Sequence, residues 1–205
     1  NIRKEKMQNI LATIGIETDR EKAELLYKDY ITKELALTAT GSVDEETNAF
    51  TLKLNNEIKK PALEQRFPLY IAEVDAEKFY IIPLRGAGLW DAIWGYVALE
   101  SDKNTIRGAV FDHKGETAGL GAEITQQWFQ DRFKQEKVFD ENGQLVGINV
   151  SKTNNDPTDS DKNDHEVDAI SGATITGDGV TAMIYERLQH YLPFFSQENN
   201  TVAAN

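Results

Sequence analysis

Cysteine is absent from the 205 residues of this sequence, which excludes disulfide bonds, thiolate chemistry and iron–sulfur ligation. Histidine is scarce, and His113, His165 and His190 are scattered without the HxxxH spacing of a helical zinc site. No GxSxG elbow marks a serine nucleophile, so a stand-alone hydrolase is not favoured. We therefore expect no catalytic residue and no metal ligand on this chain.

Positive charge is in the minority, with 22 lysine and arginine residues against 34 aspartate and glutamate residues and a formal net charge of -12. Such a chain repels a phosphate backbone, so no nucleic-acid partner is expected. No apolar run approaches the roughly 20 residues that span a bilayer. The sequence starts at Asn1 and enters a charged helical pattern directly, so we expect a segment upstream of Asn1 to have been removed.

Hydrophobic residues make up 40% of the chain, enough for one domain with a substantial core. Apolar residues at helical spacing predict a first helix ending at Gly15 and a second over about 19–35. Short β-rich runs between turn clusters then predict strands at 50–54, 69–74, 79–83, 94–99, 106–111 and 146–150.

Two further helices are predicted towards the carboxyl terminus. The first, over 123–133, carries Ile124, Trp128 and Phe129 on one side. The second holds apolar residues at helical spacing over 180–192, and Pro193 ends its pattern. The fold class expected is α+β, a single domain with a strand-rich centre and helices at both ends.

Three segments are expected along this single domain. Residues 1–40 form an N-terminal helical segment that follows the removed segment, residues 41–196 form the folded domain, and residues 197–205 form a disordered tail.

Small residues and hydroxyls crowd the stretch DAISGATITGDG, from Asp168 to Gly179, immediately before the final helix. A helix N-terminus attracts anions, and small residues let a phosphate approach the backbone. The candidates for a phosphate seat are Ser171, Gly172, Ala173, Thr174, Thr176 and Gly177. The alternative is that Thr174 or Thr176 caps the helix and the glycines form a turn. A dinucleotide fingerprint over 177–182 is discounted because no buried strand precedes it.

An acidic loop over 154–164 contains Asp156, Asp159, Asp161 and Asp164. An EF-hand loop begun at Asp159 would require glycine at its sixth position and glutamate at its twelfth, but aspartate and isoleucine stand there. A solvated acidic loop is therefore the favoured interpretation.

Two glycine-rich turns follow β-like runs, RGAGLW at 85–90 and GETAGLG at 115–121. Each carries an apolar residue that could lie against a flat ring. As hairpin and strand-to-helix turns they also need no further explanation, and Trp90 and Trp94 could be ordinary core residues.

Taken together, DAISGAT at 168–174 and these two turns resemble the C subunits of sodium-translocating NADH:quinone oxidoreductases, a group of FMN-binding-domain proteins. The resemblance covers nearly the whole chain. It implies that a flavin transferase reads Asp168, Ser171, Gly172 and Ala173 and moves FMN from FAD onto Thr174 as a phosphoester. Thr176 is the second choice, as a cap or a phosphate contact.

The same resemblance implies where the isoalloxazine ring lies. The turn formed by Glu116, Thr117, Gly119, Leu120 and Gly121 would flank the ring, with Leu120 packed on it, and Leu89 and Trp90 would lie on the other side of the pocket. The group usually has proline where this chain has Ala118, which makes that loop looser.

The activity implied is electron relay in a larger enzyme: the flavin passes single electrons between neighbouring subunits, from NADH oxidation towards quinone, coupled to sodium export. The location implied is the bacterial inner membrane, with the soluble domain on the periplasmic side. The resemblance also implies that the segment removed ahead of residues 1–40 is a single-pass membrane anchor. The alternatives are the G subunit of the Rnf electron-transport complex, which shares the threonine tether, and a flavin-free extracytoplasmic binding module.

Overall fold

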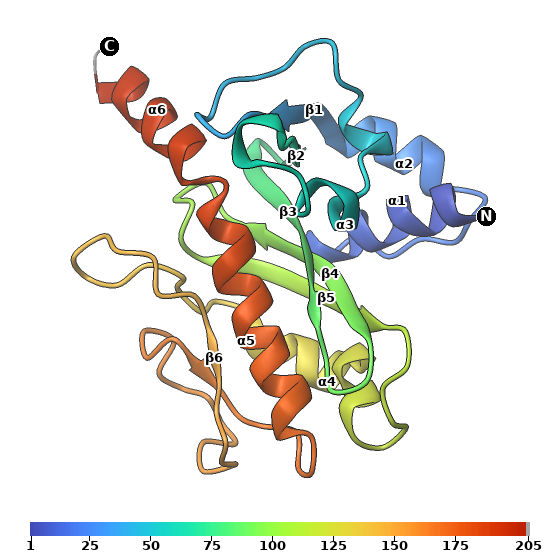
Figure 1. The fold of residues 1–205 in the computed structure, drawn as a ribbon, viewed down its shortest axis with the longest axis vertical. Helices are drawn as coiled ribbons and strands as arrows, with labels where there is room; N and C mark the ends of the chain where they lie inside the picture. Colours follow the sequence, from blue (N-terminus) through green and yellow to red (C-terminus); the bar gives the residue numbers. More distant parts are fainter. Residues whose placement is uncertain (204–205) are drawn as a thin grey trace.

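The computed structural model describes residues 1–203, and its centre is a five-stranded antiparallel sheet with strands in sequence order (Figure 1). Strands β2 (Phe67–Val74) and β3 (Glu77–Ala87) are joined by Asp75 and Ala76, both with positive φ, as a tight hairpin requires. The four central predictions at 69–74, 79–83, 94–99 and 106–111 are confirmed. The strands are β1 (Ile31–Leu37), β2 (Phe67–Val74), β3 (Glu77–Ala87), β4 (Ala92–Leu99) and β5 (Ile106–His113).

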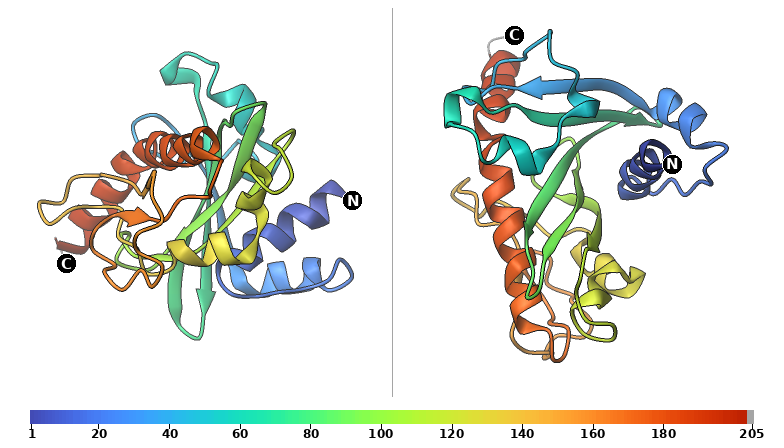
Figure 2. Two further views of the ribbon diagram at one scale, coloured as in Figure 1. Left: turned by 90° about the horizontal axis from the view of Figure 1, so that it is seen from below. Right: turned by 45° about the vertical axis from the view of Figure 1, so that its right-hand side comes forward.

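Helices cover both faces of the sheet, as the right-hand view of Figure 2 shows. Alternating residues of one strand enter different cores: Leu69 packs in the core that contains α5 (Thr174–Gln189), whereas Tyr70 packs with α1 (Ile2–Thr13) and α2 (Ala23–Tyr30). The α+β prediction is therefore confirmed. In the part of the chain that the structure describes, no helix has the length and apolar character needed to cross a membrane.

The amino-terminal segment departs from the prediction, because the second helix ends at Tyr30 rather than near residue 35. Ile31–Leu37 forms β1 and pairs with β2 along its length. The strand begins with two β-branched residues and has exposed residues at its centre, both of which suit a strand at the edge of a sheet. Backbone pairing with β2 therefore prevails over the helical spacing of the apolar residues. Residues 1–40 are thus helical only in part, and they join the same sheet as the rest of the chain.

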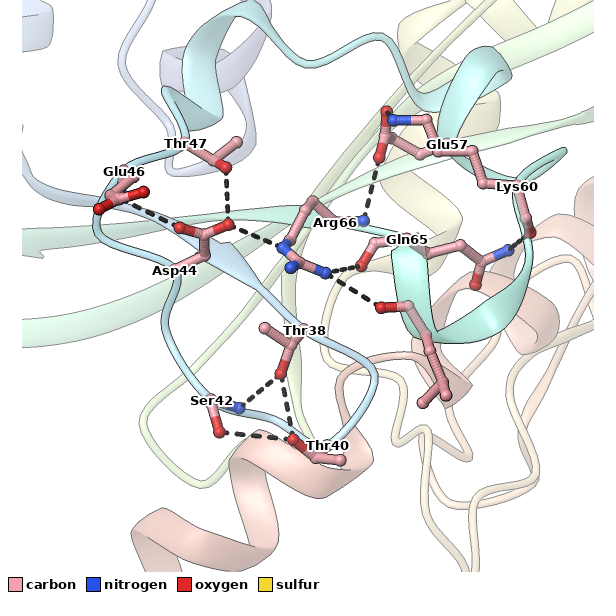
Figure 3. Close-up of polar contacts among 11 residues, drawn as sticks. Thr38, Thr40, Ser42, Asp44, Glu46, Thr47, Glu57, Lys60, Gln65 and Arg66 are labelled. Carbon is pink, nitrogen blue, oxygen red and sulfur yellow. Dashed lines mark hydrogen bonds and ion pairs between the residues drawn. The ribbon is translucent and has the colours of Figure 1, made fainter.

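The connection between β1 and β2 contains no strand at 50–54, where one was predicted. It forms η1 (Ala49–Thr51), α3 (Leu54–Glu57) and η2 (Ala62–Glu64) instead. Arg66 organises it: its Nε donates to Asp44 Oδ2 at 2.8 Å and its backbone N–H donates to Glu57 Oε1 at 3.0 Å (Figure 3). These contacts hold the connection beside the start of β2.

The helix predicted over 123–133 is broken into η3 (Gly121–Thr125), α4 (Gln127–Gln130) and η4 (Asp131–Phe133). The break lies at Gln126, whose backbone is extended. Ile124 and Phe129 are buried as expected, whereas Trp128 is half-exposed.

At the carboxyl end, Pro193 does not end the helical pattern but lies in the first turn of a new helix, α6 (Leu192–Ala203). Proline is well tolerated there, because first-turn amides have no helical partner. The expected disordered tail at 197–205 is therefore helical as far as Ala203, and residues 204–205 lie outside the described residues. The strand expected at 146–150 is reduced to β6 (Asn149–Val150), which pairs in parallel with β7 (Glu166–Val167).

Candidate functional site

A cavity of about 260 Å³ lies at the amino-terminal end of α5, which is the lower end of that helix in Figure 1. The turn between β3 and β4, the segment after β5 and the start of α5 all contribute to its wall. The three sequence motifs, far apart along the chain, therefore meet at one place. The cavity is lined by Leu89, Trp90, Thr117, Leu120, Gly121, Gly172, Ala173, Thr174, Ile175 and Thr176.

The start of α5 has no side-chain cap. Ala173 occupies the capping position, so the alternative in which Thr174 or Thr176 caps the helix is wrong. The first-turn N–H groups have no intrahelical partner and lie at the positive end of the helix dipole. Thr174 is exposed beside them. An anion at this end of the cavity would meet open amides and a free hydroxyl.

Glu116 connects the three motifs from beneath the cavity. Its Oε1 accepts hydrogen bonds from the Leu89 amide at 2.7 Å and the Thr176 hydroxyl at 2.6 Å, and its Oε2 accepts one from the Trp90 amide at 2.9 Å. Its own backbone N–H donates to His113 Nδ1 at 3.0 Å. The Glu116 side chain thus fixes the β3–β4 turn against the start of α5.

The charge of Glu116 is maintained by these contacts although the residue is buried. Burial alone would raise the pKa of Glu116, but the hydrogen bonds from Thr176 and from backbone amides outweigh it, so its pKa lies below the usual value. With its acceptor sites occupied, this carboxylate serves to position the cavity wall.

Glycine is required where the motifs approach most closely. A Cβ on Gly121 would collide with Thr176 Oγ1, and a Cβ on Gly88 would collide with Glu116 Oε1. Gly172 has a φ of +76°, and Leu120 Cδ2 would lie 2.9 Å from a Cβ placed there. Gly88 was not predicted as part of the site, since only the folded chain reveals its contact.

The rim of the cavity carries large apolar side chains that water still reaches. Leu89, Leu120 and Ile175 are 46%, 40% and 55% exposed, and Trp90 is 68% exposed. Ile175 was missed from the sequence, although its position between two threonines at a helix start could have indicated it. This rim offers an apolar surface to a flat ring.

Some predicted site residues shape the cavity without lining it. The buried Asp168 carboxylate accepts the Asp156 amide at 3.2 Å, and the Ser171 hydroxyl accepts from Asn154 Nδ2 at 3.0 Å. Gly119, with a φ of +77°, serves the turn. Arg132, which sequence reasoning missed, donates to the carbonyls of Asp168 and Ala169 at 2.8 and 3.0 Å. These contacts set the path of the segment that leads to Thr174.

Comparisons with known proteins point to one group. A family model described as FMN-binding domain matches residues 88–189. The C subunit of the Na(+)-translocating NADH-quinone reductase of Vibrio parahaemolyticus is 34% identical in a match that covers 86% of this chain and 74% of that protein.

Two solved structures resemble the whole fold. The crystal structure of the corresponding C subunit from Parabacteroides distasonis has a TM-score of 0.84 and 38% identity, over 95% of this chain and 92% of that one. The crystal structure of Shewanella oneidensis NqrC has a TM-score of 0.79 and 26% identity, over 95% and 96% of the two chains.

Proposed function

The chain belongs to the family of C subunits of Na(+)-translocating NADH-quinone reductases, and on that premise we propose that it carries FMN and relays single electrons towards quinone within such a complex. The observation that carries this proposal is the convergence of three motifs on one cavity at an uncapped helix start. FMN, when bound, supplies the one-electron chemistry, and the protein supplies binding and orientation.

The proposed attachment point is Thr174, through a phosphoester between its hydroxyl oxygen and the FMN phosphorus. In transfer from FAD, the P–O–P bond breaks, AMP leaves with the bonding electron pair, and the hydroxyl proton goes to a base of the transferase. Two other hydroxyls of the motif are already engaged, since Thr176 donates to Glu116 and Ser171 accepts from Asn154. Thr174 alone combines exposure with a place beside the first-turn amides, which would stabilise the remaining phosphodiester charge.

The size of the cavity favours a covalent cofactor. Small-molecule pockets commonly measure about 300–1,000 Å³ and enclose most of the ligand. A cavity of about 260 Å³ with an exposed apolar rim encloses less of a flavin, so contacts alone would hold it weakly. The tether keeps the carrier loaded, while Leu89, Trp90, Leu120 and Ile175 provide apolar contact for the ring.

The proposed setting follows from the family. The other subunits of the redox complex are the partners of the mature protein, and a flavin transferase is its partner during maturation. We place the domain on the periplasmic side of the bacterial inner membrane, held by a single-pass anchor upstream of Asn1.

Co-expression with a flavin transferase tests the attachment. We expect the intact mass to rise by one FMN less water, and the yellow colour to survive denaturation and map to the peptide that contains Thr174. Thr174→Ala should abolish the mass gain. Thr117→Ala, which removes another exposed hydroxyl of the same cavity, is the matched control and should retain it.

Two results would contradict the proposal. Flavin that stays attached in Thr174→Ala would make the assigned residue wrong. An unmodified wild-type chain, from cells in which the transferase modifies a known substrate, would favour the flavin-free binding module.

A further inference from the structure

A buried carboxylate lies outside the flavin cavity, directly after η4. The Glu136 side chain has no solvent exposure, and among the described residues no donor forms a hydrogen bond with either of its carboxylate oxygens. Its backbone is fixed, since its carbonyl accepts the Ile106 amide of β5 at 2.9 Å. Buried carboxylates are normally supplied with donors or cations, because desolvation of an isolated charge is costly. Glu136 therefore requires an explanation.

Two aspartates of the acidic loop face this buried group. Carboxylate oxygens of Glu136, Asp159 and Asp164 lie within 4.8 Å of one another. Asp159 Oδ1 is also buried without a hydrogen-bond partner. Three carboxylates at this separation repel one another strongly when ionised, unless a cation lies among them.

Among the described residues one positive side chain, that of Lys162, reaches the cluster, and it satisfies only part of it. Lys162 Nζ lies 2.7 Å from Asp159 Oδ2 but 3.8 Å from Glu136 Oε1, which is beyond hydrogen-bond distance. When all three carboxylates are ionised, one ammonium leaves two negative charges uncompensated. The Lys162 side chain is 30% exposed, so it can turn towards solvent when another cation arrives.

We propose that Glu136, Asp159 and Asp164 form a binding site for a hard divalent cation, with Ca²⁺ as the ion of best fit. The cluster offers only oxygen ligands, which suit Ca²⁺ and Mg²⁺ rather than zinc. Ca²⁺ accepts irregular geometry and water ligands, whereas Mg²⁺ demands a regular octahedron, and ligands from two separate segments favour the more tolerant ion. The spacing differs from an EF-hand because Glu136 comes from outside the loop.

The loop that supplies the aspartates is held at both ends. His165 Nδ1 lies 2.6 Å from the Lys137 carbonyl oxygen, and the Asp156 amide donates to Asp168 at 3.2 Å. A cation would fix the middle of the loop over Glu136. Since Asp168 begins the segment that ends at Thr174, the ion would also make the approach to the proposed tether more rigid.

The alternative occupant of the cluster is a proton. Burial, together with the nearby Asp159 carboxylate, raises the pKa of Glu136 to about 9. A neutral Glu136 can therefore share its proton with Asp159 and leave no affinity for metal. Titration with the metal alone distinguishes the two states.

The test is thermal unfolding and calorimetric titration of the full chain with CaCl₂, against NaCl of matched ionic strength. We expect one ion per chain with a dissociation constant of about 10⁻⁴–10⁻³ M, the range of extracellular calcium modules. Saturating CaCl₂ should raise the melting temperature by about 3–6 °C. MgCl₂ should give a smaller shift.

The calcium response of two variants, one inside the cluster and one outside it, decides the proposal. Glu136→Gln should abolish the calcium-specific shift, whereas Asp161→Asn should retain it, because Asp161 is an exposed acid of the same loop outside the cluster. Equal stabilisation by NaCl, or an equal calcium response in both variants, would assign the effect to charge screening and overturn the proposal. If Glu136→Gln does not fold, the calorimetric titration of the wild-type chain decides. A wild-type chain that shows no saturable heat of binding for one calcium ion per chain would also overturn the proposal.

Discussion

The two ends of α5 are built differently. At the amino-terminal end Thr174 and Ile175 are exposed, and no side chain caps the helix. Beyond the carboxyl end Tyr191 is fully buried and its hydroxyl donates to the Pro68 carbonyl at 2.6 Å. There His190 also stacks on Phe67, with ring centroids 3.8 Å apart.

The contrast shows how one helix serves two purposes. Aromatic packing against β2 concentrates stability at the end that carries no site residue. The other end can then leave its amides open and its surface uncovered, which a helix without such packing could not sustain. Substitutions at the two ends should therefore separate stability from cofactor attachment.

The largest loss of stability is expected for Tyr191→Ala. Removal of a fully buried aromatic ring leaves a cavity and should lower the free energy of unfolding by about 3–5 kcal/mol. Chemical denaturation measures this loss. The folded fraction should still accept flavin during co-expression, and a complete loss of attachment in folded protein would show that the two ends are coupled.

A smaller loss of stability is expected for Glu116→Gln, which should also loosen the wall of the cavity. The side-chain nitrogen of the new glutamine would face the backbone N–H of Leu89 or Trp90, both of which now donate to the carboxylate. Two donors facing each other should lower the free energy of unfolding by about 1–3 kcal/mol. Flavin yield should fall as the β3–β4 turn loosens. Denaturant titration and absorbance after denaturation measure the two effects, and unchanged values in both would refute the positioning role of Glu116.

Acid should destabilise the aromatic packing beyond the carboxyl-terminal end of α5. Burial, and then the charge of Arg187, lowers the pKa of His190 from 6.5 to about 4. A lowered pKa in the folded state means that stability is complete above pH 6.5 and is lost as the pH falls towards 4. His190→Phe keeps a ring on Phe67 without a titrating group, so the difference between melting temperatures at pH 7 and pH 5 should shrink. An equal difference in the variant would exclude His190 as the cause.

The smallest change in stability is expected for Thr174→Ala. An exposed hydroxyl that caps nothing contributes little, so the free energy of unfolding should change by less than about 0.5 kcal/mol. Denaturation of the flavin-free wild type and variant measures it. A loss of more than about 1 kcal/mol would indicate a capping role that the geometry does not contain.

Much of the fold could be predicted where pattern and packing agree. The β-rich runs of β2, β3 and β4 are read directly, because each of these strands places residues in the cores on both faces of the sheet, and β5 adds Ile106, Ala109 and Phe111 to the core that contains α5. Ile31–Leu37 was mistaken for helix because short apolar runs fit either period. Residues 50–54 were mistaken for strand because the contacts of Arg66, made at long range, decide that connection.

The candidate site shows the same division. Motifs that share small residues and hydroxyls indicated the cavity wall, but Glu116 acts through backbone amides, which no side-chain pattern reveals. Glu136 gave no signal either, because one buried glutamate in an acidic sequence looks like any solvated one. Glu116 was expected at the site, but its positioning role, like the place of Glu136, became visible only from burial and distance.

The shallow cavity with its exposed rim has a kinetic consequence. Trp90 and Ile175, on the rim of the cavity, are both exposed to solvent. Electrons tunnel efficiently only over short distances, so the distance from this rim to a neighbouring cofactor matters. A flavin held there, as we propose, would lie beside this exposed rim, within reach of the surface of a docked subunit. Turnover would then depend on how long the two surfaces remain in contact.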